Sequence, residues 1–205
     1  MAARRSGRRR GRAWLLLLGV IALVALGAGW YSVHQAMPGW YARLWYPLEH
    51  EDAINREAAR RNLDPALVAA VVWRESDFHE GSRSGPGAVG LMQLLPSTAR
   101  FIASQPGHPA ADPARLEDPD VNIAYGAWYL RYLLDRHGSL PLALAAYNGG
   151  TANVSRWVRE AQARGAAFRA PDDVPFPETR RFVRDVQRAR SIYRRSYGDR
   201  LAPAP

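Results

Sequence analysis

The chain has 205 residues, 47% of them hydrophobic, which suffices for one domain of ordinary size together with a terminal extension. It contains no cysteine, which excludes a disulfide framework, thiol catalysis, cysteine zinc sites and a lipid anchor on an acylated cysteine. The formal net charge is +9, but six arginines between residues 4 and 12 leave only +3 (9 − 6) for the remainder. This mildly basic remainder suits an anionic surface and gives little support for a nucleic-acid partner.

A segment without charged residues, bounded by Trp14 and Trp30, follows the arginine-rich head. Extended by three residues, a helix of this length spans roughly 30 Å, the thickness of a hydrocarbon core. The arginines predict a cytoplasmic tail over residues 1–12, an uncleaved transmembrane anchor over 13–33 and a domain on the extracytoplasmic side. A signal peptide cleaved within this segment is the alternative, and it would also export the domain.

Residues 34–47 are predicted to form a juxtamembrane linker, because prolines and a glycine stand among four aromatic residues. These aromatics either lie at the lipid interface or pack on the domain. The folded domain is predicted over residues 48–198, with a first helix near its start, and a short C-terminal tail over 199–205.

A second helix begins after Asp64, a favoured N-cap residue that is followed by proline at the first helical position. At about 100° per residue, Glu75 projects within roughly 60° of Val68 and Val72, on the face that should meet the core. Loss of hydration there raises the pKa of a carboxyl group and keeps a proton available near neutral pH, as a general acid requires. A buried glutamate paired with an arginine is the structural alternative.

A glycine-rich loop from Gly85 to Gly90 follows this helix. Its glycines let the backbone approach a ligand closely, and Gln93 supplies an amide that can donate and accept hydrogen bonds. The letters match the dinucleotide fingerprint G-x-G-x-x-G, but a helix rather than a strand precedes them, so nucleotide binding is disfavoured. A carboxylic acid that faces a groove lined by backbone suits a sugar.

Five further helices are predicted from caps, periodicity and helix breakers, at residues 96–104, 121–137, 141–148, 152–164 and 178–196. The predicted helix at residues 121–137 has a nearly continuous apolar face and should lie at the centre of the core. Two glycines stop the helix at 141–148, which places Tyr147 and Asn148 at a helix end where side chains can point into a cleft. The expected fold is all-α, a bundle of about seven helices.

Three short motifs and the spacing between them resemble those of the soluble lytic transglycosylases, the goose-type-lysozyme-like family that cleaves peptidoglycan. The motifs are Glu75-Ser76, Gly90-Leu91-Met92-Gln93 and Ala146-Tyr147-Asn148. The resemblance extends from about Tyr46 to Tyr197, and it departs from the common pattern at Leu95 and Phe182, where many members have Met and Tyr. It implies a lysozyme-like helical bundle with a long groove for glycan strands.

The resemblance also implies a chemistry that needs only one carboxylate. Glu75 would protonate the oxygen of the MurNAc-β-1,4-GlcNAc bond, and the muramyl 6-hydroxyl, deprotonated by Glu75, would close on C1 to give a 1,6-anhydro end. Glycosidases normally need a second carboxylate, and the sequence offers no obvious one beside Glu75. The positions that match family contacts to the sugar, its acetamide and its stem peptide are Ser84, Gln93, Tyr147, Asn148 and Glu178.

Two alternatives stay open at this point. A lysozyme-type muramidase would admit water and leave a reducing end, and an inactive glycan-binding scaffold of an envelope machine would bind without cleavage. The five histidines show no metal-ligand spacing such as H-E-x-x-H. We therefore expect two partners: peptidoglycan strands and, through the N-terminal helix, the cytoplasmic membrane. The sequence does not identify further partners among the envelope proteins. We expect no nucleic acid, metal or cofactor.

Overall fold

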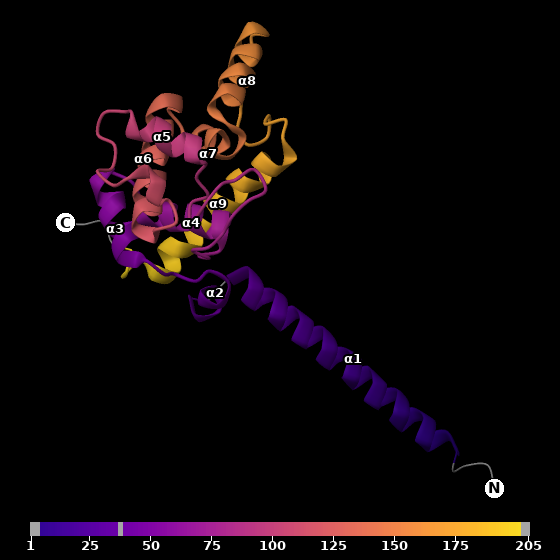
Figure 1. The fold of residues 1–205 in the computed structure, drawn as a ribbon. Helices are drawn as coiled ribbons and strands as arrows, with labels where there is room; N and C mark the ends of the chain where they lie inside the picture. Colours follow the sequence, from indigo (N-terminus) through magenta and orange to yellow (C-terminus); the bar gives the residue numbers. More distant parts are fainter. Residues whose placement is uncertain (1–4, 37–38, 202–205) are drawn as a thin grey trace. The chain divides into compact units, whose positions relative to one another are not determined.

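The computed structural model describes residues 5–36 and 39–201 (Figure 1). The chain forms two compact units, Met1–Tyr41 and Ala42–Pro205, each described here by itself. Both are helical, and the described residues contain no strand, only two isolated β-bridges, Arg83↔Val89 and Val89↔Leu94. The prediction of an all-α fold is therefore confirmed.

The first unit contains one long helix, α1, which runs from Arg5 to Ala36. It begins inside the predicted N-terminal tail and contains the whole predicted anchor; residues 1–4 lie outside the described part. Every side chain from residue 16 to residue 32 is exposed. No helix in the described part of the chain combines the length and the hydropathy of a membrane span, so the transmembrane anchor stays a prediction.

The predicted linker is partly helical, because α2 covers Gly39–Trp45. From Ala42 onward this segment belongs to the second unit and is held there by hydrogen bonds from distant residues. The phenols of Tyr193 and Tyr197 donate to the carbonyls of Pro47 at 2.6 Å and Tyr46 at 2.8 Å. The end of the predicted linker is thus part of the domain. Its last aromatic residue, Tyr46, is buried there, whereas Trp40 and Trp45 are exposed.

Seven α-helices and one short 3₁₀ helix follow in the described residues of the second unit. They are α3 (Glu51–Arg60), α4 (Pro65–Ser76), α5 (Pro96–Ala103), η1 (Pro113–Arg115), α6 (Pro119–His137), α7 (Leu140–Gly149), α8 (Thr151–Ala163) and α9 (Pro177–Tyr197). The seven α-helices are those that the sequence predicts, and the five with predicted bounds differ from them by at most two residues at either end. Among these eight elements, only η1, which is three residues long, is not predicted from the sequence.

Local capping explains several of these helix ends. The Asp64 carboxylate accepts a hydrogen bond from the Ala66 N–H at 3.1 Å, with a proline at the first position of α4. Asp118 caps α6 in the same way, through the N–H of Asp120 at 3.0 Å. Gly138 ends α6 in the left-handed conformation, with φ of 72°.

The core surrounds α4, which packs along α9, while α6 packs against α3 and α7. Residues Pro65–Val72 are buried on all sides of α4, and those from Val68 to Val72 have no exposed surface. The start of α4 is therefore a fully enclosed helix, not one with a single apolar face. Only its last turn, which carries Glu75, reaches partial exposure.

Candidate active site

Glu75 lies in the last turn of α4, just before the left-handed residue Asp77 ends the helix. No hydrogen bond or ion pair to another described residue engages its carboxylate. Burial raises the pKa of Glu75 to about 8, against a smaller lowering by the Arg74 guanidinium, and the charge of Glu178 raises it further. At neutral pH Glu75 is therefore mostly a protonated acid at a partly exposed position.

The arginine next to this acid is engaged elsewhere. Arg74 donates from Nε to Asp185 on α9 at 3.0 Å, and its guanidinium lies 5.7 Å from the centre of the Phe182 ring. The structural alternative for Glu75, a buried carboxylate neutralised by an arginine, is not what the structure contains. The pKa of Glu75 is raised because burial disfavours its charged form and no ion pair with an arginine among the described residues offsets that effect.

Tyr147, near the end of α7, donates a hydrogen bond to the loop between α4 and α5, residues 77–95, which contains the glycine-rich segment. Its phenol donates to the Met92 carbonyl at 2.8 Å, and its ring stacks on Phe182 with 6.3 Å between centroids. Burial raises the pKa of Tyr147 well above its ordinary value, and the charge of Glu75 raises it further, so the two side chains lie within electrostatic range. The role that the sequence analysis expects for Tyr147, contact with the glycan strand, stays a prediction.

Gln93 and Ser84 both stabilise the loop in which they lie. The Gln93 amide nitrogen donates to the carbonyls of Ser82 at 3.0 Å and Gly90 at 2.9 Å, and Gln93 itself has a positive φ of 47°. The Ser84 hydroxyl oxygen accepts from the Ala88 N–H at 3.0 Å. Both were expected to contact a ligand, and what they retain for one is the carbonyl oxygen of Gln93 and the hydroxyl proton of Ser84.

Asn122 on α6 fixes this loop to the core, a task that the sequence does not reveal. It has no exposed surface; it accepts from the Met92 N–H at 2.7 Å and donates to the carbonyls of Val89 at 2.9 Å and Leu116 at 2.8 Å. A Cβ on Gly90 would stand 2.3 Å from the Asn122 amide nitrogen. The only available signal was one asparagine in the apolar face of a core helix.

Asn148 and Glu178 line a second part of the site, where α7 ends and α9 begins. The Asn148 side-chain oxygen accepts from the Thr179 hydroxyl at 2.7 Å, which leaves its amide N–H groups for a ligand. Both residues line a cavity of about 390 Å³ that also contacts Phe176. Glu178 is exposed, and it acts on Glu75 through its charge.

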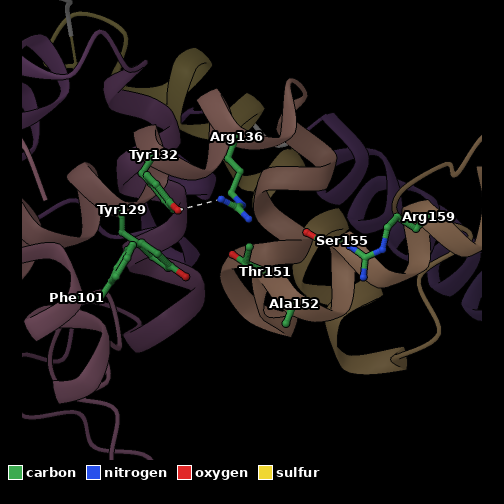
Figure 2. Close-up of a pocket in the computed structure, with 8 residues that line it drawn as sticks. All are labelled: Phe101, Tyr129, Tyr132, Arg136, Thr151, Ala152, Ser155 and Arg159. Atoms are coloured by element: carbon green, nitrogen blue, oxygen red, sulfur yellow. Dashed lines mark hydrogen bonds between the residues drawn. The ribbon is translucent and has the colours of Figure 1, made fainter.

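A larger cavity of about 550 Å³ lies between α6 and α8, and no sequence pattern indicates it (Figure 2). Tyr129 lines this cavity, and its ring centroid is 5.6 Å from that of Tyr147. Aromatic side chains therefore lead from the neighbourhood of Glu75 into the cavity. Its lining residues are Phe101, Tyr129, Tyr132, Arg136, Thr151, Ala152, Ser155 and Arg159.

These features define a class of protein: a helical domain with one proton-donating carboxyl, an adjoining polar loop and room for an extended ligand. In the part of the chain that the structure describes, no three metal-binding side chains converge.

Comparison with known proteins agrees with this class. The family model described as "Transglycosylase SLT domain" matches residues 52–168. The soluble lytic murein transglycosylase of Escherichia coli K12 is 31% identical over 192 residues, which cover 88% of this chain and 29% of the relative. The membrane-bound lytic murein transglycosylase C of Yersinia pestis (strain Pestoides F) is 29% identical over 163 residues, which cover 69% of this chain and 46% of the relative.

Among solved structures, the chain is similar to the lytic transglycosylase Slt of Pseudomonas aeruginosa, an inactive mutant in which glutamine replaces a glutamate. The TM-score is 0.68 and the identity 33%, over 89% of this chain and 30% of that one. The chain belongs to the transglycosylase SLT domain family. It spans less than a third of the length of the Escherichia coli and Pseudomonas relatives.

Proposed function

We propose that this protein is a peptidoglycan lytic transglycosylase that cleaves the MurNAc-β-1,4-GlcNAc bond without water and leaves 1,6-anhydro-MurNAc ends. The observation that carries the proposal is Glu75, a carboxyl group with no hydrogen-bond or ion-pair partner in the described part of the chain, whose pKa burial raises to about 8 within the family's helical domain. A carboxyl group in this state can donate a proton at neutral pH and take one back later in the same reaction.

The proposed reaction uses Glu75 twice. The carboxyl group first gives its proton to the glycosidic oxygen as the bond from C1 breaks, while the acetamido group of the muramyl sugar stabilises the positive charge at C1. The Glu75 carboxylate then removes the proton of the 6-hydroxyl as that oxygen bonds to C1. The acid is regenerated, and no water is consumed.

The remaining site residues are proposed to hold the glycan strand. The free carbonyl oxygen of Gln93 can accept from a sugar hydroxyl or acetamide N–H, and the free amide of Asn148 can donate to a sugar oxygen. Ser84 would contact the strand from the loop, and Glu178 would contact it from the start of α9. Tyr147 holds the loop through the Met92 carbonyl and so positions Gln93.

Analysis of product mass tests this proposal directly. Purified glycan strands digested with the wild-type chain should yield anhydromuramyl ends, which are lighter by one water than the reducing ends that hydrolysis gives. Glu75→Gln should bind the same strands and release neither product. Anhydro products at a near wild-type rate from Glu75→Gln would refute the assignment of Glu75 as the acid.

Hydrolysis with water as the attacking group is the second candidate, because the charge of Glu178 acts on Glu75. Glu178 would then be the base of a two-carboxylate muramidase. Products with reducing ends from the wild-type chain, lost in Glu178→Gln, would support this candidate. Exclusively anhydro products would reject it. Strand binding by the wild-type chain with no product of either kind would instead favour a glycan-binding scaffold.

We also propose that residues 13–33 hold the domain at the extracytoplasmic face of the cytoplasmic membrane. The support is the uncharged segment between two tryptophans after an arginine-rich head, together with the name of one relative, which is membrane-bound. Protease added to intact spheroplasts should digest the domain, and mass analysis should find an uncleaved N-terminus. A mature chain that begins within residues 13–33 would leave export standing and reject the anchor.

A further inference from the structure

Two guanidinium groups reach the cavity between α6 and α8. Arg136 comes from the last turn of α6 and Arg159 from the middle of α8, on opposite sides of the space that Ser155 and Thr151 also border (Figure 2). Among the residues that the structure describes, no acidic one lines this cavity. It therefore carries two positive charges that its own walls do not balance.

Arginines that lie on the same two helices but do not line the cavity have partners of their own, whereas Arg136 and Arg159 have no ion pair among the described residues. Arg131 on α6 pairs with Asp135, and Arg156 on α8 lies 3.9 Å from Glu160 and donates to Asn153. Within residues 39–201, the only side-chain hydrogen bond of Arg136 is to the Tyr132 hydroxyl, at 3.3 Å, and Arg159 has neither a hydrogen bond nor an ion pair. Their donors are free for a ligand.

Aromatic rings form the wall beside these charges. Tyr132 stacks on Trp128 with a centroid distance of 5.4 Å, and Phe101 meets Tyr132 edge to face at 5.5 Å. Tyr129 continues this wall toward Tyr147, at 5.6 Å. A ligand that fits must offer apolar surface to the rings and an anionic group to the arginines.

We propose that Arg136 and Arg159 form a subsite for a carboxylate of the stem peptide on a glycan strand bound at Glu75. This inference rests on the proposed function. A peptidoglycan strand with stem peptides combines sugar rings with peptide carboxylates, and guanidinium groups bind carboxylates through two parallel hydrogen bonds. The subsite makes the protein selective for strands that carry stem peptides with free carboxylates.

The test measures binding, so that it does not depend on turnover. The full chain with Glu75→Gln is titrated with uncleaved strands that carry peptide stems, and with the same strands after their carboxylates have been converted to amides. We expect amidation to weaken binding about tenfold, the size of one lost hydrogen bond to a charged group. Arg136→Gln and Arg159→Gln, each added to Glu75→Gln, should reduce this ratio to nearly one.

Arg156→Gln is the matched control, because Arg156 lies on the same helix as Arg159 but does not line the cavity. It should keep the full ratio. A ratio near one for Glu75→Gln alone, or an undiminished ratio after loss of either cavity arginine, would overturn the subsite.

Turnover by the wild-type chain is measured separately. A binding ratio near one together with anhydro products from the wild-type chain rejects the subsite and leaves the proposed function intact. A ratio that depends on both arginines, without turnover by the wild-type chain, rejects the proposed function and supports carboxylate recognition.

Discussion

The hydroxyl of Tyr147 donates to the main-chain carbonyl of Met92 at 2.8 Å, across 55 positions of sequence. This bond joins the end of α7 to the loop residue immediately before Gln93. The aromatic ring that lies in electrostatic range of Glu75 therefore also sets the position of the loop.

Tyr147→Phe should lower both stability and turnover. The Met92 carbonyl would lose its partner, which costs about 1 kcal/mol and lowers the thermal midpoint by roughly 2 to 4 °C for a chain of this size. Turnover should fall more than strand affinity, because Gln93 would no longer be held in place. Calorimetry and product analysis on the same preparation measure the two effects, and unchanged turnover with the expected loss of stability would make Tyr147 purely structural.

Glu75→Gln should change the dependence of stability on pH. The folded-state pKa of Glu75 is about 8 and the ordinary value 4.5, so folding becomes less favourable as pH rises between these values, and the penalty is complete above about 8. The glutamine variant lacks this penalty. It should match the wild type near pH 4.5 and exceed it by roughly 2 kcal/mol at pH 9, less than the full shift because the carboxyl is partly exposed. Urea unfolding across this range measures the difference, and parallel profiles would contradict the raised pKa.

Glu178→Gln should move the alkaline limb of the activity profile toward lower pH. The charge of Glu178 raises the pKa of Glu75, so removal of that charge lets Glu75 ionise earlier and lose its proton sooner. The pH dependence of kcat/KM measures this shift. Asp185→Asn is an informative comparison, because it releases Arg74 from its partner and should lower the pKa of Glu75 in the same direction. An unmoved limb in Glu178→Gln would show that the two charges do not interact.

Gly126→Ala should destabilise the domain through Met92. A Cβ at Gly126 would stand 2.2 Å from the Met92 sulfur, so the methionine and the loop that carries it must shift, at a cost of about 1 to 3 kcal/mol. Met92→Ala in the same chain removes the sulfur and the terminal methyl group and leaves only the Met92 Cβ, at 2.8 Å from the added carbon, so it relieves most of the clash. The double variant should therefore be less destabilised than the sum of the two single variants, and strict additivity in urea unfolding would contradict the proposed contact.

The helices were predictable because their signals are local. Asp64 and Asp118 each lie two residues from the N–H groups that they cap, and Gly138 follows the last turn of α6 directly. The burial of the helix around Glu75 is predicted from a single apolar face. The structure shows that helix buried, but α4 is enclosed on all sides rather than along one face.

The parts that escaped prediction depend on contacts between distant residues. Asn122 reaches the loop across 30 positions, and nothing near it in sequence distinguishes it from a packing residue. The amide of Gln93 is turned inward by a left-handed backbone at a residue other than glycine, which sequence patterns do not reveal. The cavity with Arg136 and Arg159 exists only once α6 and α8 are assembled.

The hydrogen bonds from Tyr193 and Tyr197 to the segment at Tyr46 and Pro47 have a consequence for how the chain is made. The beginning of the domain cannot reach its final place until α9 has been synthesised, and α4, which carries Glu75, lacks its main packing partner until the same moment. Nascent chains released before α9 is complete should accordingly be unfolded and inactive, so that the acid is assembled only in finished molecules.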